Sequence, residues 1–192
     1  MSSKRYIKAV TFGRFNIGHT GHTDLIIGML NQATEAHVYV STGKSNNDWD
    51  CRVLLLKLLL RKADVDLKRV KFLKSNSPYA AVEDATADAP RGSVVLMLGT
   101  DQQKLLTALG NKFECGTLLN PRINSSTQVR YLVDDVRFEN TLNKLYYNDY
   151  FLITTVKVLR KQELQREESL EASTETREVV GGNASVEHHA TS

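Results

Sequence analysis

The feature that most constrains the fold is a regular alternation of strand-like and helix-like segments along most of the chain. Apolar runs rich in β-branched residues predict five strands, at residues 6–12, 36–42, 69–75, 93–100 and 115–120. Helical patterns follow them at residues 22–34, 48–64, 77–87, 101–109 and 125–135. The run SVVLMLGT is uninterrupted, which is typical of a strand buried on both faces of a parallel sheet. The alternation therefore predicts an α/β fold, a doubly wound, Rossmann-like parallel sheet of five strands.

Three regions of different character follow one another along the 192 residues. The predicted sheet domain covers residues 1–138 and a C-terminal helical extension covers 139–172. The extension carries apolar residues that we expect to pack back on the domain: Leu142, Leu145, Tyr146, Tyr150, Phe151, Val156 and Leu159. Residues 173–192 are polar, contain glycine and lack periodicity, which predicts a flexible or loosely attached tail.

Charge is distributed unevenly between these regions. Residues 161–192 hold three basic residues against seven glutamates, a net charge of −4, and the total of +3 leaves +7 for the rest. A basic body with an acidic tail indicates that the body meets an anionic ligand and that the tail could contact a protein partner. The basic residues are scattered and not interleaved with aromatic residues, so no nucleic-acid site is predicted.

Membrane and secretion signals are not visible in the sequence. The longest apolar stretch, VLLLKLLL, is far shorter than the roughly 20 residues that span a bilayer, and the N-terminus has no apolar core typical of a signal peptide. The two cysteines, Cys51 and Cys115, have no metal-binding spacing and favour reduced thiols. We expect a cytoplasmic protein.

The stretch TFGRFNIGHTGHTDLI, residues 11–26, places two histidines where the first predicted strand gives way to a helix. Phosphates bind at this junction in mononucleotide-binding folds, because the free N–H groups and the dipole of the helix start attract anions. His19 and His22 could donate hydrogen bonds to phosphoryl oxygens there. The alternatives are incidental surface histidines or a metal pair, and zinc is disfavoured because no third ligand stands at a useful spacing.

A second stretch, INSSTQVR at residues 123–130, begins another predicted helix after the fifth strand. Its hydroxyl side chains and N–H groups at a helix start, with Arg130 one turn further along, could hold the same anion. Alone, this stretch is better explained by a serine N-cap followed by a solvated arginine. The two stretches together favour a phosphate site.

In combination, G-x-F-x-x-x-H-x-G-H and S-S-T-x-x-R resemble the HxGH-type nucleotidyltransferases, and most closely the nicotinamide-mononucleotide adenylyltransferase branch. The resemblance covers roughly residues 5–135. It implies that a phosphate oxygen of a small acceptor attacks the α-phosphorus of a nucleoside triphosphate and that pyrophosphate leaves. It also implies Mg²⁺ that arrives with the triphosphate, no resident metal site, and a family in which oligomers are common.

The same resemblance assigns roles to individual residues. Catalytic contacts fall to His19, His22 and Arg130, and nucleotide contacts to Gly13, Arg14, Phe15, Gly21, Gly99, Asp101, Ser125, Ser126 and Thr127. Lys44 and Arg52, in the loop TGKSNNDWDCR, are weaker candidates for a contact with the acceptor phosphate or the triphosphate. Lys44 is equally explained as a solvated lysine, and Asp101 as the cap of the next helix.

Three departures from the family pattern bear on the acceptor and on the loops. Ile17-Gly18 stands where the family usually has a proline before the first histidine, and Asn124 offsets the second motif by one residue. Leu109 occupies a position at which the nicotinamide branch often has a tryptophan for ring stacking. These departures leave the triphosphate half of the predicted site intact and leave the acceptor open.

Three functional hypotheses remain at this point. The first is an adenylyltransferase that uses ATP, and the second is a cytidylyltransferase that uses CTP and a phospho-alcohol. The third is a catalytically silent protein that serves in structure or assembly, because the GRFN opening resembles members encoded by tailed phages, which would place the chain in a host cytoplasm or a virion. The intact histidine pair and Arg130 favour the first two, because a module without chemistry has no physical reason to keep them.

Overall fold

The computed structural model describes residues 5–43, 48–121 and 125–190, with side chains described as far as residue 176. The strands are β1 (Tyr6–Gly13), β2 (Ala33–Ser41), β3 (Val70–Ser75), β4 (Val94–Gly99) and β5 (Gly116–Asn120). The helices are α1 (Thr20–Gln32), α2 (Trp49–Lys62), α3 (Pro78–Thr86), α4 (Gln103–Phe113), α5 (Ser126–Asp134), α6 (Glu139–Leu145) and α7 (Tyr150–Ala190). Single turns of 3₁₀ helix occupy Leu67–Arg69, Thr100–Gln102 and Val136–Phe138.

The five strands form one parallel sheet in the order β3-β2-β1-β4-β5, so the predicted doubly wound α/β fold is confirmed. The chain leaves β1 toward β2 on one side and later returns to β4 on the other side. The strand order therefore reverses between β1 and β4, and ligands of such sheets bind beyond the carboxyl ends of the strands at this reversal.

Two layers of helices cover the sheet because successive residues of each strand point to opposite faces. Ala9 and Val95 pack with α1 and α2, and their neighbours Val10 and Leu96 pack with α3 and α4. Helix α1 buries one face in the first layer, with Leu25, Ile26, Met29 and Leu30 all inside it.

Element boundaries follow local capping. Ser77 caps α3 by accepting a hydrogen bond from the Ala80 N–H at 3.1 Å, and Pro78 occupies the first turn. The predicted helix 22–34 differs from the observed α1 at both ends. Helix α1 begins earlier, because His19 is its cap, and it ends earlier, because extended backbone at Ala33 starts β2 without a loop.

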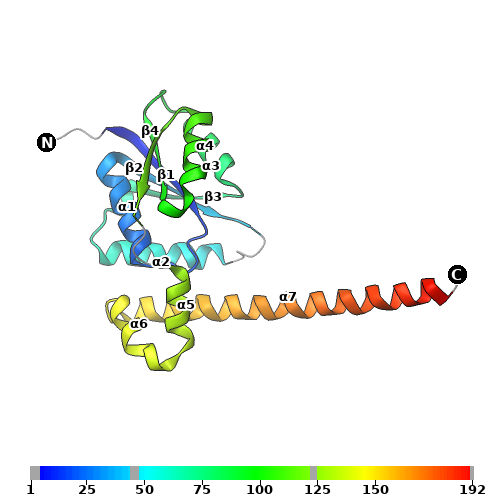
Figure 1. Ribbon diagram of the computed structural model, residues 1–192. Coiled ribbons are helices and arrows are strands. Elements are labelled where there is room, and N and C mark those ends of the chain that lie inside the picture. The colour runs from blue at the N-terminus through cyan, green and yellow to red at the C-terminus, as the bar shows by residue number, and fades with distance from the viewer. Residues whose placement is uncertain (1–4, 44–47, 122–124, 191–192) are drawn as a thin grey trace.

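The C-terminal extension packs under α2 and the loop between β1 and α1 (Figure 1). A third apolar cluster joins Ile17 and α2 to α5, α6 and the first turns of α7. Leu142, Tyr146, Val156 and Leu159 are buried there as expected, whereas Tyr150 and Phe151 are 75% and 71% exposed, so their predicted packing is wrong. These two residues begin α7 on the side that faces away from the cluster.

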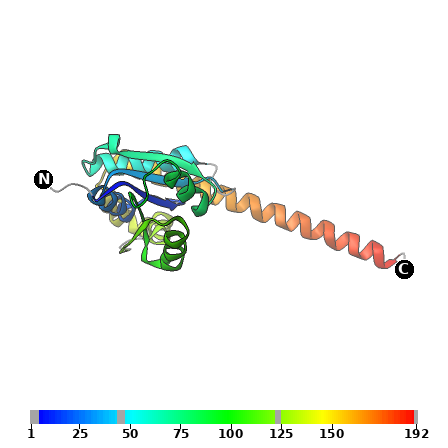
Figure 2. The same ribbon diagram turned by 90° about the horizontal axis from the view of Figure 1, so that it is seen from above.

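Helix α7 continues as a single helix to Ala190, where the sequence predicts a flexible tail. Its first half lies along the body and its second half extends beyond it, as both views show (Figures 1 and 2). The glutamates and basic residues between 160 and 172 are good helix formers, which favours this continuation. No helix among the described residues is long and apolar enough to cross a membrane.

Candidate active site

A cavity of about 500 Å³ lies at the carboxyl ends of β1 and β4, where the strand order reverses. Every residue to which the sequence analysis assigned a catalytic or nucleotide contact lines it: Gly13, Arg14, Phe15, His19, Gly21, His22, Gly99, Asp101, Ser125, Ser126, Thr127 and Arg130. The structure therefore brings together two segments that are more than 100 positions apart in the sequence. The helices α1 and α5 both begin at this cavity.

The wall of the cavity beside β1 is formed by a close approach between Gly13 and Phe15. A Cβ atom on Gly13 would lie 3.2 Å from the Phe15 ring, which is tighter than ordinary packing. Phe15 itself has a φ of 50°, in the left-handed region, and its ring is buried. Because left-handed backbone is unfavourable for a side chain of this size, packing on Gly13 must hold the turn.

The two histidines form a reciprocal cap at the start of α1. His19 Nδ1 accepts a hydrogen bond from the Gly21 N–H at 3.0 Å, and His22 Nδ1 accepts one from the His19 N–H at 3.3 Å. The rings stack with centroids 3.9 Å apart, and the Phe15 ring meets His22 edge-on at 4.9 Å. This is the geometry of a capping box built from imidazoles.

The cap also fixes which ring nitrogen carries the proton. In a neutral imidazole one nitrogen accepts and the other donates. Because both Nδ1 atoms accept backbone hydrogen bonds, each neutral ring carries its N–H at Nε2. The cavity is therefore lined by two imidazoles whose donors are set by the local backbone, which suits the recognition of an anion.

The start of α5 faces the same cavity. Ser125 is the N-cap and accepts a hydrogen bond from the Gln128 N–H at 3.1 Å. Ser126 Oγ donates to the Ile17 carbonyl oxygen at 3.0 Å, which ties the start of α5 to the loop that precedes α1. Thr127 lines the cavity in the first turn. The free N–H groups at such a helix start attract anions.

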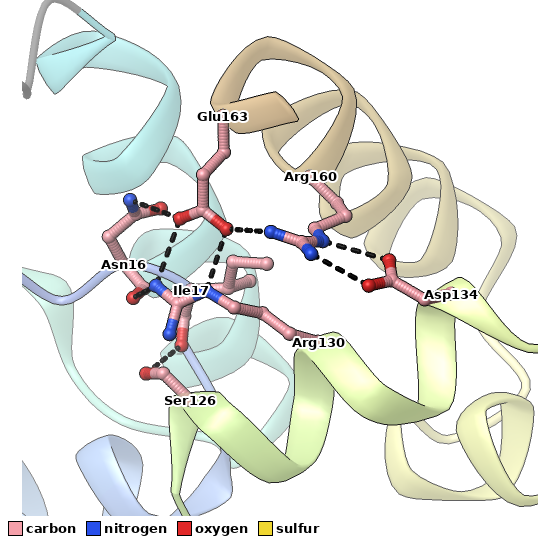
Figure 3. A network of polar contacts seen from close by, with 7 residues as sticks. All are labelled: Asn16, Ile17, Ser126, Arg130, Asp134, Arg160 and Glu163. Carbon is pink, nitrogen blue, oxygen red and sulfur yellow. Dashed lines mark hydrogen bonds and ion pairs between the residues drawn. The ribbon is translucent and has the colours of Figure 1, made fainter. Parts of the chain in front are cut away.

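Arg130 lies one turn into α5 and is held by groups far away in the sequence (Figure 3). Its Nε and Nη2 donate to the two carboxylate oxygens of Glu163, at 2.6 and 2.9 Å, and Nη2 also donates to the Asn16 carbonyl oxygen at 2.6 Å. Arg130 still lines the cavity and keeps 29% of its side chain exposed. A fixed positive charge thus stands beside the start of α5.

Gly99 and Asp101 close the side of the cavity that belongs to β4. A Cβ atom on Gly99 would lie only 2.9 Å from Asp101 Oδ1, so the strand end leaves room for this carboxylate. Asp101 is the only acidic residue among the described residues that line the cavity. No group of three or more metal-ligating side chains occurs in the described part of the chain. One carboxylate at this position fits a cation whose remaining ligands are phosphate oxygens and water, as is common for Mg²⁺.

Arg52 does not reach the cavity, although the sequence analysis made it a candidate for a phosphate contact. Its side chain is fully buried and donates hydrogen bonds to the carbonyl oxygens of Arg14 and Ser41, with Asp48 as its ion-pair partner at 3.5 Å. Burial lowers the pKa of Arg52 from its ordinary value, and Asp48 opposes that shift. Arg52 thus supports the loop between β1 and α1 through the Arg14 carbonyl oxygen and does not contact the cavity. The other weak candidate, Lys44, lies outside the described residues.

The sequence analysis missed several residues that build the site. Thr11, Phe12, Asn16, Leu25, Gln102 and Asn120 also line the cavity. Asn120 ends β5, so the rule that ligands lie at the carboxyl ends of strands could have found it. Glu163 has no such signal, because it lies 33 positions from Arg130 in a charged helix that is typical of a solvated surface.

Comparisons with known proteins give a match by structure and not by sequence. No protein-family model matches the sequence, and no curated protein sequence matches it. A bifunctional NMN adenylyltransferase/ADP ribose pyrophosphatase from Francisella tularensis superposes with a TM-score of 0.59 at 15% identity, over 90% of this chain. A Plasmodium falciparum nicotinic acid mononucleotide adenylyltransferase complexed with APC gives 0.57 at 16% identity, over 79% of this chain and 94% of its own.

The chain therefore has the fold of these adenylyltransferases. It spans 57% of the length of the bifunctional Francisella protein. A second structure of that protein, complexed with AMP and a Mn ion, matches with a TM-score of 0.53 at 14% identity, over 80% of this chain and 52% of that one.

Proposed function

We propose that this chain is a nucleotidyltransferase that moves AMP from ATP to a small acceptor bearing a phosphate, such as nicotinamide mononucleotide, and releases pyrophosphate. One observation carries the proposal: two helix starts, a pair of imidazoles and an arginine converge on one cavity at the reversal of the strand order. A triphosphate is a ligand whose charge and length suit two anion-binding helix starts with an arginine beside one of them.

The reaction follows from the chemistry of the acceptor. An ionised phosphate oxygen of the acceptor attacks the α-phosphorus in line. A new P–O bond forms as the bond from the α-phosphorus to the bridging β-oxygen breaks, and the electron pair leaves with pyrophosphate. No proton has to be removed from the nucleophile, so the site works by positioning and by stabilising negative charge.

In this scheme His19 and His22 are catalytic residues. Their Nε2–H groups would donate hydrogen bonds to phosphoryl oxygens as charge develops in the transition state. The start of α5, with Ser126, Thr127 and Arg130, would hold the β- and γ-phosphates. Charge-assisted hydrogen bonds of this kind contribute about 1.5–3 kcal/mol each.

The proposal includes Mg²⁺ bound with the nucleotide. Asp101 is positioned to contact a cation at the edge of the cavity, with triphosphate oxygens and water as the remaining ligands. When bound, the ion would neutralise charge on the leaving pyrophosphate. The Francisella protein has a structure complexed with AMP and a Mn ion, which supports a nucleotide and a divalent cation as ligands here.

The preference for ATP and for a nicotinamide acceptor rests on the structural neighbours and on the sequence motifs. Both neighbours described above are adenylyltransferases for pyridine mononucleotides. Leu109, at the position where a stacking tryptophan is common, is fully buried against α3 and β4 and does not line the cavity. A pyridine ring would therefore need a different contact, and a phospho-alcohol acceptor with CTP is the alternative.

Release of pyrophosphate tests the proposal. ATP and CTP, each with Mg²⁺, would be offered in turn with nicotinamide mononucleotide, phosphopantetheine, glycerol phosphate and phosphocholine. We expect release with one pair and its loss in His22→Ala. If no pair releases pyrophosphate and the protein also fails to bind ATP and CTP, the proposal is wrong. A role in structure or assembly, which the projecting helix α7 would suit, would then be the better hypothesis.

A further inference from the structure

The C-terminal extension touches the loop between β1 and α1 at two points. The Tyr146 hydroxyl donates to the Gly18 carbonyl oxygen at 2.6 Å, across 128 positions of sequence. Asn16 Nδ2 donates to Glu163 Oε2 at 2.9 Å, across 147 positions. Residues on either side of Ile17 are thus held by groups that belong to neither sequence motif.

Glu163 also sets the orientation of Arg130. Its carboxylate binds the Nε and Nη2 edge of the guanidinium in the two-point geometry that fixes an arginine most firmly (Figure 3). The third nitrogen, Nη1, makes no hydrogen bond or ion pair with any residue that the structure describes. In Figure 3 this nitrogen lies on the side of the guanidinium that faces Ser126. Glu163 therefore restrains the Nε and Nη2 edge of the guanidinium, and the Nη1 group stays directed toward the start of α5.

Glu163 is itself braced. Arg160 donates to the same carboxylate and forms a two-point pair with Asp134 of α5, at 2.8 and 2.7 Å. The Glu163 side chain is only 13% exposed. Burial alone would raise the pKa of Glu163, but hydrogen bonds and charge from Arg130 and Arg160 lower it, so the carboxylate is ionised at neutral pH. Alternating charges thus lock α7 to α5 beside the cavity.

We propose that Glu163 is a positioning residue of the active site, which holds Arg130 in the orientation that binds the triphosphate and so makes the C-terminal helix part of the site. This inference rests on the function proposed above. An arginine on a long flexible stem binds more weakly when its guanidinium has to be ordered by the ligand itself. The alternative predicts the opposite result. If the Glu163 carboxylate competed with the triphosphate for Arg130, it would weaken binding of the triphosphate, and its removal would tighten that binding.

Equilibrium binding of ATP and of inorganic triphosphate, each with Mg²⁺, measured by calorimetry on the full chain, separates these effects. The variants are Glu163→Gln, Arg130→Ala and the double variant. Glu167→Gln is the matched control, because Glu167 is an exposed glutamate one turn further along α7. Glu163→Asp is a second probe that keeps the charge and shortens the side chain, in case Glu163→Gln unfolds.

We expect Glu163→Gln to weaken binding about fivefold, within the range found for coupled neighbours, and Glu167→Gln to leave it unchanged. Arg130→Ala should weaken it roughly tenfold, the loss of about one charge-assisted contact. The double variant should match Arg130→Ala, since Glu163 acts through Arg130. A general disturbance of the fold would instead add to the effect of Arg130→Ala.

Other results overturn the inference in distinguishable ways. Unchanged or tighter binding in Glu163→Gln, or additive losses in the double variant, would contradict the role of Glu163 and leave the proposed function standing. If the parent protein binds neither ATP nor triphosphate, the proposed function is wrong and this inference is wrong with it.

Discussion

The two helix starts that face the cavity are held in different ways. At α1 the ring nitrogens of His19 and His22 are fixed by backbone N–H groups at most three positions away. At α5 the side chain of Arg130 is fixed by groups 33 and 114 positions away. One half of the site is therefore assembled by local sequence, and the other half depends on the whole fold and on the C-terminal extension.

This difference predicts how each half fails. A local cap forms with the first turn of the helix, so distant substitutions should leave the histidine pair in place. A side chain held by tertiary contacts is displaced when any of those contacts is removed, because neighbouring polar groups are energetically coupled. Substitutions in α6 and α7 should accordingly disturb the α5 half of the site first.

The largest expected effect is loss of turnover when the imidazole of His22 is replaced. His22→Gln keeps a side chain that can accept the His19 N–H hydrogen bond, since glutamine is a common partner in capping boxes. We expect kcat to fall by about 10²–10³-fold, the usual consequence of losing a well-placed donor to the transition state, because the glutamine NH₂ group does not reproduce the position of the imidazole Nε2–H. Steady-state release of pyrophosphate measures it.

His22→Ala separates catalysis from capping at the same position. It should be as inactive as His22→Gln and also less stable, by about 1 kcal/mol, because the cap is lost. Chemical denaturation measures this stability. Near-parental activity in either variant would show that His22 serves only as a cap.

The next largest effect is a higher KM when Arg130 is replaced, because Arg130 at α5 corresponds to the histidine pair at α1. Arg130→Lys keeps the charge and loses the planar fork that Glu163 holds. We expect the KM for the nucleoside triphosphate to rise by about fivefold, less than the roughly tenfold loss of binding expected for Arg130→Ala, because lysine keeps the charge but not the oriented donors. Arg137→Lys, at a side chain that is 79% exposed, is the control and should behave like the parent. Equal KM values for the two variants would contradict the assignment.

Sequence reasoning reached the parts of this molecule whose signals are local. The five strands, the start of α3 near residue 77 and the position of the histidine pair each depend on residues within a few positions of one another. Gly99, Ser126 and Arg130 could be placed at the cavity because parallel strands bring their carboxyl ends to one edge of the sheet.

The rest depended on packing that a single sequence does not show. Arg52 lies in the first turn of α2, close in sequence to a loop that we expected to meet phosphate, yet its guanidinium binds two backbone carbonyl groups and Asp48. Glu163 looks like any solvated glutamate until α7 folds back against α5. Tyr150 and Phe151 resemble core residues in composition, but the third cluster is completed by Leu152 and Val156 on another face of the same helix.

A smaller effect, on stability, is expected for Tyr146, which follows α6 and contacts the loop between β1 and α1. Tyr146→Phe removes the hydroxyl that donates to the Gly18 carbonyl oxygen and leaves that buried oxygen without its partner. The free energy of unfolding should fall by about 1–3 kcal/mol. Urea denaturation measures it, with Tyr150→Phe as the exposed control. If both variants match the parent, the extension does not brace the loop through this bond.

The smallest effect is a pH dependence of the contact between α5 and α7. The pKa of Glu163 lies below its ordinary value of 4.5: burial opposes this shift, and Arg130 and Arg160 outweigh burial. A carboxylate whose pKa is lowered by folding stabilises the protein fully above that ordinary value and loses its contribution as the pH falls through the folded-state pKa.

The difference in free energy of unfolding between the parent and Glu163→Gln should therefore be constant above about pH 5 and shrink toward pH 3. Urea denaturation of both proteins across this range tests the prediction. A difference that stays the same at both ends of the range would mean that the charge of Glu163 does not contribute.

The central claim is that the cavity between the two helix starts transfers a nucleotidyl group by attack at the α-phosphorus. The most direct test follows labelled ATP through the reaction, with the label on the α-phosphate in one sample and on the γ-phosphate in the other. The acceptor is the one identified by pyrophosphate release. Our account predicts that the α-label appears in the product with the acceptor, that the γ-label appears in pyrophosphate, and that His22→Gln slows the appearance of both by about 10²–10³-fold. Release of γ-label as orthophosphate, or transfer of γ-label to the acceptor, would contradict it.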